Sequence, residues 1–353
     1  IYTNGISPLM LAAKCQQVSI VNALLQAGAD VTSPNNFYEE GDTSLIHVTR
    51  LSLVDIMHIF ALAGADVNAK NGLGQSALNV AIRYGKVDAV KCLLAHGADV
   101  NLRTKSGDTP LILTAENGNA TLCKEFISRG ADLDAVNNHG DTALIQAARN
   151  GHSDVIKVLI HAGAKINHIN DSKMSALRFA VGQSLFSCSP CLMYLLEAGV
   201  NIHSELHYAV TLGLTHVVKQ LLAYNALPQA IQSCWLSFIP SLPQKMPYLS
   251  PLCVALITER IEIVQQFLDM VFLTDFDLKV LHKNPLFRRY LKDSSRNESL
   301  HFLDFVLPVP LSLHSLSLLA VSKAVGFNSH SRRSRISGTG LPPLLQRKLM
   351  FVS

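Results

Sequence analysis

A five-residue pattern close to Gly-Ala-Asp-Val-Asn occurs six times along this chain at an almost constant spacing. Its leading glycines are Gly28, Gly64, Gly97, Gly130, Gly163 and Gly199. By subtraction, the steps between them are 36, 33, 33, 33 and 36 residues. A fixed period of this length predicts supersecondary units that stack on one another, because a single unit cannot bury its own apolar face.

The residues inside one period predict a pair of helices. A second motif, Gly-x-Thr/Ser-x-Leu, precedes the Gly-Ala patterns, as in Gly-Asp-Thr-Pro-Leu at 107–111, with Lys173 in the place of the glycine in the sixth copy. Its Thr109 suits the N-cap of a first helix and Pro110 suits the first turn. A second helix is expected over Asp88–Ala95, with its apolar side chains on one face. Gly97 then fits a left-handed C-cap.

The two motifs and their 33-residue period resemble the ankyrin repeat. The resemblance implies an all-α fold, a solenoid of helix pairs joined by short hairpin fingers, with seven repeats over residues 1–227. Ala81, Ala115, Ala147 and Ala148 are expected where helices of adjacent repeats approach closely. Ankyrin repeats are binding scaffolds, so the resemblance implies a protein-binding role and makes catalysis by the repeats unlikely.

Departures from the period locate the irregular parts of the chain. Repeat six has three extra residues near Ser184–Pro190, and the loop around Asn35–Glu40 is also longer. The finger between repeats six and seven is largely deleted. Beyond repeat seven we expect a Pro-rich insertion with a degenerate eighth repeat over 228–270, starting at Ser250, and a helical cap or linker over 271–308.

Composition agrees with a stacked helical array. The 353 residues are 48% hydrophobic, yet no apolar run approaches the ~18 residues of a membrane span. Seven scattered cysteines indicate a reducing compartment, hence a cytoplasmic or nuclear protein. A net charge of +4 predicts no nucleic-acid partner. The chain begins at Ile1 with repeat one almost at once, so we expect a fragment or a trimmed product.

Three local patterns could suggest other chemistry. Cys188-Ser-Pro-Cys191 is a C-x-x-C, but no second ligand pair follows at zinc-finger spacing. His203-Ser-Glu-Leu-His207 has the order H-x-E-x-H, not the H-E-x-x-H of zinc hydrolases. Arg332-Arg-Ser-Arg335 is a short basic cluster typical of a solvated loop. We expect no metal, no cofactor and no catalytic residue, and a zinc hydrolase around His203 and His207 is the weakest alternative.

The last 45 residues resemble a SOCS box. The resemblance implies an elongin-C-binding segment, whose family pattern is Ser/Pro-Leu, three residues, Cys, three residues and an aliphatic residue. The matching positions are Ser312, Leu313, Leu316, Ser317 and Val321, with Ser317 in the place of the Cys. A Leu-Pro element, similar to the cullin-5-recognition segment, follows at Leu341, Pro342, Pro343 and Leu344, with its second proline out of register.

Ankyrin repeats followed by a SOCS box over 309–353 form the layout of the ankyrin-repeat-and-SOCS-box family. This resemblance implies a non-catalytic substrate receptor of a cullin–RING ubiquitin ligase, with elongin B/C, cullin 5 and a target protein as partners. Two alternatives stay open. Residues 311–325 can be a final capping helix of the solenoid, and the chain can be a plain ankyrin scaffold or inhibitor with no role in ubiquitination.

The target-binding surface is expected on the concave face of repeats three to five. The non-stacking residues at matching positions are Arg83, Tyr84, Glu116, Asn117, Arg149 and Asn150. The fingers at 70–73, 103–106 and 137–139 flank them, and the site is expected to end before Gly199. Arg and Tyr are frequent anchors of interfaces. Replacing Arg83, Tyr84 and Arg149 together is expected to remove the target without changing the melting temperature.

Overall fold

The computed structural model describes residues 7–32, 41–184, 189–202, 204–224, 226, 230–232 and 248–269, and the single residues 277, 280 and 299. The chain forms two compact units, residues 1–180 and 181–353, and each is treated by itself below.

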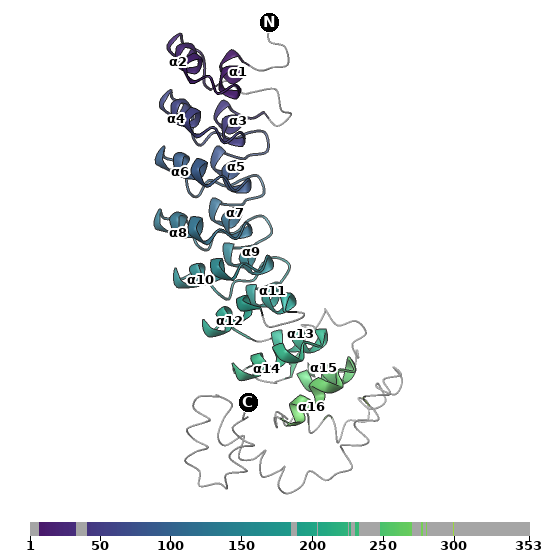
Figure 1. Ribbon diagram of the computed structural model, residues 1–353. Helices are drawn as coiled ribbons and strands as arrows, with labels where there is room; N and C mark the ends of the chain where they lie inside the picture. Colours follow the sequence, from purple (N-terminus) through teal and green to yellow (C-terminus); the bar gives the residue numbers. More distant parts are fainter. Residues whose placement is uncertain are drawn as a thin grey trace. The chain divides into compact units, whose positions relative to one another are not determined.

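The first unit is built from helix pairs, one pair in each repeat. A seven-residue inner helix is followed by a nine-residue outer helix. The inner helices are α1 (Pro8–Lys14), α3 (Ser44–Arg50), α5 (Ala77–Arg83), α7 (Pro110–Glu116) and α9 (Ala143–Arg149). The outer helices are α2 (Val18–Gln26), α4 (Val54–Leu62), α6 (Val87–Ala95), α8 (Ala120–Ser128) and α10 (Ser153–His161). Figure 1 shows them as two parallel columns, which confirms the predicted solenoid.

The polar residue before each inner helix caps it as the sequence predicts. The Thr109 hydroxyl accepts a hydrogen bond from the Ile112 N–H, with Pro110 at the first position of α7. Ser76 and Asn79 form a reciprocal capping box at α5. At the other end of the repeat, Gly97 follows α6 with φ +80°, the left-handed conformation that glycine adopts without strain.

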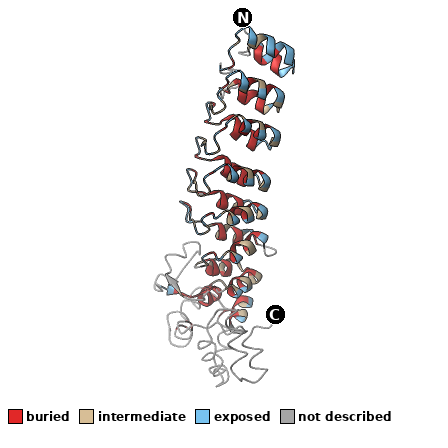
Figure 2. Cartoon of the chain, turned by 90° about the vertical axis from the view of Figure 1, so that its left-hand side faces the viewer, coloured by how far each residue is buried: buried red, intermediate tan, exposed pale blue. Residues whose placement is uncertain are grey.

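Buried apolar residues lie where neighbouring helices meet (Figure 2). Ala81, Ala115, Ala147 and Ala148 are 0% exposed, which fits the close approach expected at these positions. Larger side chains such as Phe60 and Phe126 are also fully buried. Burying one such side chain contributes about 1.5–3 kcal/mol, so most of the stability comes from contacts within and between repeats.

Side-chain amides and carboxylates join the fingers of successive repeats. Asn68 accepts a hydrogen bond from the Asp99 N–H at 2.8 Å, and Asn101 accepts one from the Asp132 N–H at 2.9 Å. At the next step Asp134 takes the place of the asparagine and accepts from the Lys165 N–H. The 33-residue period of the sequence is therefore also the period of this hydrogen-bond ladder.

The second unit continues the helix pairs with irregular connections. The division between the units falls within α11 (Ala176–Gln183), which is followed by α12 (Pro190–Glu197), α13 (Glu205–Leu212) and α14 (Thr215–Ala223). Six residues separate α11 from α12, as the predicted insertion requires, and only seven separate α12 from α13, where the finger is deleted.

The helix pair that the sequence places at Ser250 is present as α15 (Pro251–Ile257) and α16 (Ile261–Asp269), with Ser250 as N-cap of α15. One short antiparallel pair, β1 (Ile231–Gln232) with β2 (Tyr248–Leu249), precedes it. Among the described residues, the other strand-like pairings are two isolated bridges, Lys70 with Ser76 and Ile169 with Ser175. Among the described residues, no helix has the length and apolar character needed to span a membrane.

Candidate functional site

The residues proposed for target binding all lie at the C-terminal end of an inner helix, which we call the corner of the repeat. Arg83-Tyr84 ends α5, Glu116-Asn117 ends α7 and Arg149-Asn150 ends α9. In each pair the first residue is the last of its helix and the second is the C-cap. The structure thus places them at matching positions of three consecutive repeats, as their sequence spacing predicts.

The six corner residues differ in how far they are available to a partner. Arg83, Tyr84 and Glu116 are exposed, and the Tyr84 side chain is among the most exposed large apolar groups of the first unit at 54%. The two asparagines are exposed as well, but their amides are used internally. Asn117 donates to the Ile82 carbonyl one repeat away at 2.7 Å, and Asn150 donates to the Gln146 carbonyl at 3.1 Å.

Arg149 holds the fold together at its corner. Its Nη2 lies 2.8 Å from Oδ2 of Asp141, a carboxylate that is completely buried, and its guanidinium lies 4.7 Å from the centre of the Phe179 ring. Removing one partner of such a pair leaves a buried charge without its counter-ion. We therefore expect the replacement of Arg149 to lower the melting temperature, in contrast to the expectation from the sequence that the combined replacement of Arg83, Tyr84 and Arg149 leaves it unchanged.

Arg50 is a corner residue that the sequence argument missed. It ends α3, one repeat before Arg83, and its Nε lies 2.6 Å from Oδ2 of the buried Asp42. Its Nη1 also donates to the Tyr84 hydroxyl at 3.1 Å. The 33-residue period would have found it, because residue 50 stands 33 positions before residue 83. The corner extends into repeat two through this Arg50–Tyr84 contact.

The buried carboxylates explain why the corner arginines have different roles. Asp42 and Asp141 stand eight residues before Arg50 and Arg149, but the position eight residues before Arg83 is Gln75. Arg83 therefore has no buried carboxylate of its own repeat to neutralise. The repeat of α7 has the opposite combination. Its aspartate, Asp108, is present, but Glu116 stands at the position of the arginine. Within repeats two to five, Arg83 and Glu116 are thus the corner charges outside this Asp–Arg pattern.

A recess of about 280 Å³ opens beside Arg83. It lies between the end of α5 and the turn that connects α7 to α8, and Ile82, Arg83, Thr114, Asn117 and Leu122 are among the residues that line it. Its lining is part apolar and part amide or hydroxyl. Arg83 lines this recess and is itself an exposed corner residue, so the recess and the corner form one candidate binding surface.

The predicted fingers are largely occupied with one another. Lys70 donates to the Arg103 carbonyl at 2.8 Å, Lys105 donates to the Gly72 carbonyl, and Asn138 donates to the Lys105 carbonyl at 2.9 Å. These bonds hold each finger against the next and reduce the number of polar groups offered to a partner. Leu73, which is 46% exposed at a finger tip, remains accessible.

The patterns that could suggest metal chemistry are not assembled into a site in the described part of the chain. His207 is completely buried, its Nε2 bonds to the Leu249 carbonyl at 3.2 Å, and burial lowers its pKa to about 4. Cys191 is buried on α12, and burial raises the pKa of its thiol. Among the described residues, no three His, Cys, Asp or Glu side chains are placed to hold a metal ion.

Several predicted positions lie outside the described residues. These are Cys188, His203, the basic cluster at 332–335, and the whole SOCS-box set. The elongin-C positions in that set are Ser312, Leu313, Leu316, Ser317 and Val321, and the cullin positions are Leu341, Pro342, Pro343 and Leu344. Their assignment remains a prediction from the sequence.

Stacked helix pairs joined by a hydrogen-bond ladder with a 33-residue period define a repeat protein of the solenoid class. Comparison with known families identifies which one. The model of the ankyrin repeats (3 copies) matches residues 9–104, 45–137, 78–170 and 111–205, which together span more than half of the chain. The chain belongs to the ankyrin-repeat family.

A solved structure supports the assignment. The crystal structure of an ankyrin repeat domain from Acinetobacter baumannii AYE is 29% identical in sequence and superimposes with a TM-score of 0.51. The similarity covers 55% of this chain and 98% of the bacterial one. Comparison with curated proteins gave no match.

Proposed function

We propose that this chain is the substrate-recognition subunit of a cullin–RING ubiquitin ligase. The ankyrin repeats hold a target protein, and residues 309–353 recruit elongin B/C and cullin 5. The observation that carries the proposal is the order of the C-terminal motifs behind the repeats, with Ser312-Leu313 first and Leu341-Pro342 after it. In this arrangement the chain is not an enzyme, because its partners perform the transfer of ubiquitin.

The corner of repeats three and four is the proposed target site. Arg83 and Tyr84 supply a cation and an aromatic side chain next to a recess, and Glu116 supplies the opposite charge one repeat on. Aromatic and arginine side chains beside a pocket are the usual anchors of protein interfaces. Because Arg50 and Arg149 pair with buried carboxylates, we assign them to stability and leave them out of the target-binding set.

Binding of elongin C tests the ligase assignment. If Leu313 enters an apolar pocket on elongin C, its burial contributes about 1.5–3 kcal/mol, so Leu313→Asp should abolish the complex. Ser315→Asp is the matched control, since it adds the same charge two residues away, outside the motif. Ser317→Cys should tighten binding, because a buried hydroxyl without a partner costs about 1–3 kcal/mol. Wild-type binding by Leu313→Asp would refute the assignment.

Recruitment of cullin 5 is expected to depend on a separate segment. Replacing Leu341 and Pro342 by Ala should lower cullin 5 recovery while elongin B/C still binds. The second proline, Pro343, is out of register with the family pattern, so we expect weak recruitment of the cullin. Simultaneous loss of elongin would show that the tail acts as one folded element.

A plain ankyrin scaffold is the second candidate function. The departures from the SOCS pattern at Ser317 and Pro343 favour it. Such a scaffold would block or position its partner through the same corner, and it would have no reason to bind elongin. Co-purification of elongin B/C with the intact chain therefore separates the two functions.

A further inference from the structure

Repeat one carries three apolar side chains that the described residues do not fully cover. Leu11 on α1 is 55% exposed, Ile20 on α2 is 49% exposed, and Leu24 on α2 is partly exposed. We call these three residues the free face of repeat one.

The same three positions are buried in repeats two to five. The positions equivalent to Leu11 are 1–9% exposed, namely His47, Val80, Leu113 and Gln146. Those equivalent to Ile20 are 0–4% exposed, namely Ile56, Ala89, Leu122 and Val155. Those equivalent to Leu24 are 0–1% exposed, namely Phe60, Leu93, Phe126 and Leu159. Each inner helix of repeats two to five contacts the inner helix before it. Among the described residues, repeat one has a neighbour only after it, so the preceding helix pair is what covers these positions in the other repeats.

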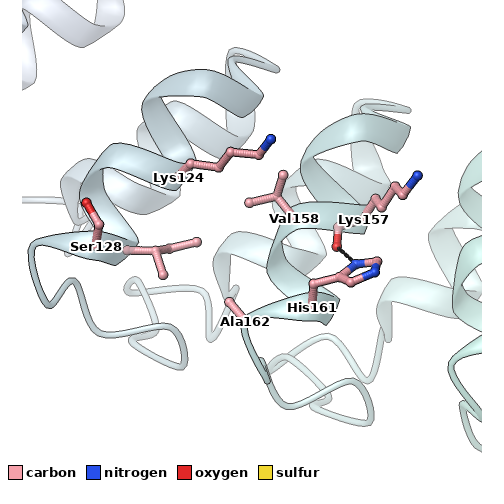
Figure 3. Close-up of a pocket in the computed structure, with 7 residues that line it drawn as sticks. Lys124, Ser128, Lys157, Val158, His161 and Ala162 are labelled. Atoms are coloured by element: carbon pink, nitrogen blue, oxygen red, sulfur yellow. Dashed lines mark hydrogen bonds between the residues drawn. The ribbon is translucent and has the colours of Figure 1, made fainter.

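Stacked outer helices leave an opening of their own, but it lies at different positions. A groove of about 500 Å³ remains between α8 and α10, and Lys124, Lys157 and His161 are among the residues that line it (Figure 3). Val155 and Leu159, the equivalents of Ile20 and Leu24 on α10, are not part of this lining and are 0% exposed. The exposure of Ile20 and Leu24 is therefore not an opening that two stacked repeats also leave.

The free face has the composition of an internal stacking surface. Terminal repeats of a solenoid need a polar outer face to remain soluble. Repeat one has a leucine where two of the buried equivalents, His47 and Gln146, are polar, and no residue of α2 is charged. The free face therefore suits coverage by another repeat better than contact with water.

An ankyrin helix pair of the same polypeptide is the occupant that these contacts favour. In repeats two to five the covering pair belongs to the same chain, and a finger joins it to the next repeat. Asn4-Gly5 precede the first inner helix at the positions of Ser106-Gly107, which belong to such a finger. A second copy of the chain would have to offer the opposite face of a repeat, and in repeats one to four that face is taken by the next repeat.

We propose that the free face of repeat one is covered, in the complete protein, by a further ankyrin helix pair that precedes residue 1 of this sequence. Its inner helix packs on Leu11 and its outer helix on Ile20 and Leu24, as α7 and α8 pack on α9 and α10. The repeat period places the leucine of its first motif 33 to 36 residues before Leu9. The glycine of its Gly-Ala pattern stands 33 to 36 residues before Gly28.

The protein purified from its natural source tests whether this pair exists. De novo sequencing of its peptides by mass spectrometry should find residues N-terminal to Ile1. These residues should contain both repeat motifs, Gly-x-Thr/Ser-x-Leu and Gly-Ala-Asp, at the spacings given above. A natural N-terminus at Ile1, or a preceding sequence without the two motifs, would overturn the proposal.

An extended chain tests whether the free face accepts a helix pair. A copy of residues 70–102, which contains α5 and α6, is placed directly before Ile1. The copy keeps the 33-residue register, because Ile1 stands at the position of Arg103. Covering the free face should slow amide hydrogen exchange in α1 and α2 by about tenfold or more. Unchanged exchange in the extended chain would show that the face is not a stacking surface.

Variants of the free face locate the effect. Leu11→Gln combined with Ile20→Gln should cancel the slowing in the extended chain, because the covered face becomes polar. In the chain without the added pair, this variant should change the exchange of α1 and α2 by less than about twofold, because both residues are exposed there. Leu62→Gln is the matched control and should leave the slowing intact, since Leu62 is 70% exposed although repeat two has neighbours on both sides. Slowing that survives the Leu11→Gln, Ile20→Gln variant would contradict the role of this face.

Analytical ultracentrifugation distinguishes a second copy as the occupant. We expect the intact chain and its Leu11→Gln, Ile20→Gln variant to have the same oligomeric state. A dimer of the wild-type chain that is lost in this variant would assign the free face to a second copy and overturn the proposal. Because these measurements involve neither elongin nor a target, their failure leaves the ligase proposal unaffected.

Discussion

Arg149 provides the sharpest test of how the corner residues divide between stability and binding. Its partner Asp141 is completely buried, whereas 37% of the Arg149 side chain is exposed. Breaking a fully buried ion pair costs about 3–5 kcal/mol. In Arg149→Met, Asp141 still accepts hydrogen bonds from Asn170 at 2.7 Å and Gln146 at 3.1 Å. Because Asp141 keeps these donors and solvent is close by, we expect Arg149→Met to lower the free energy of unfolding by about 1–3 kcal/mol.

Arg83→Met is the matched control for this experiment. It changes the same residue type at the same position two repeats earlier, where Gln75 replaces the buried aspartate. A surface substitution of this kind should change the free energy of unfolding by less than about 0.5 kcal/mol. Urea unfolding at pH 7, monitored by circular dichroism, measures the free energy of unfolding of both variants. Equal midpoints for the two variants would refute the division of the corner into structural and binding residues.

Two further predictions concern single buried contacts. Burial lowers the pKa of His207 from 6.5 to about 4. Between these two pH values the unfolded chain takes up a proton that the folded chain does not. The free energy of unfolding should therefore fall by about 1–3 kcal/mol as the pH is lowered from 6.5 to 4. His207→Gln should show a smaller fall in the same pH series, and an identical fall would contradict the assignment to this residue. Gly118→Ala should lower the melting temperature more than Gly130→Ala. Both glycines have φ near +80°, so the backbone strain is shared. Only a Cβ at Gly118 would meet a side chain, the His152 ring at 2.5 Å. Equal losses would mean that the ring moves aside without cost.

The regular part of the fold could be predicted from the sequence because each of its determinants is local. Thr109 and Pro110 start a helix, Gly97 ends one, and the 33-residue period places every copy in register. The same period located the insertion before α12 and the deleted finger before α13. These features depend on residues close in the chain, so no knowledge of the tertiary contacts was needed.

The roles of the site residues could not be predicted in the same way. Whether a corner arginine is structural depends on the presence and the burial of an aspartate eight residues earlier, and burial cannot be read from the sequence alone. The recess beside Arg83 lies between the end of α5 and the turn that connects α7 to α8 in the next repeat, and this contact between repeats cannot be read from the sequence.

Affinity purification of the chain from cell extract, with and without residues 309–353, tests the central proposal most directly. Quantitative mass spectrometry should recover elongin B, elongin C and cullin 5 with the intact chain. All three should be lost on truncation, while proteins held by the ankyrin repeats remain. Equal absence of elongin and cullin from both samples would contradict the ligase-receptor function and leave an ankyrin scaffold that binds its partner without ubiquitin chemistry.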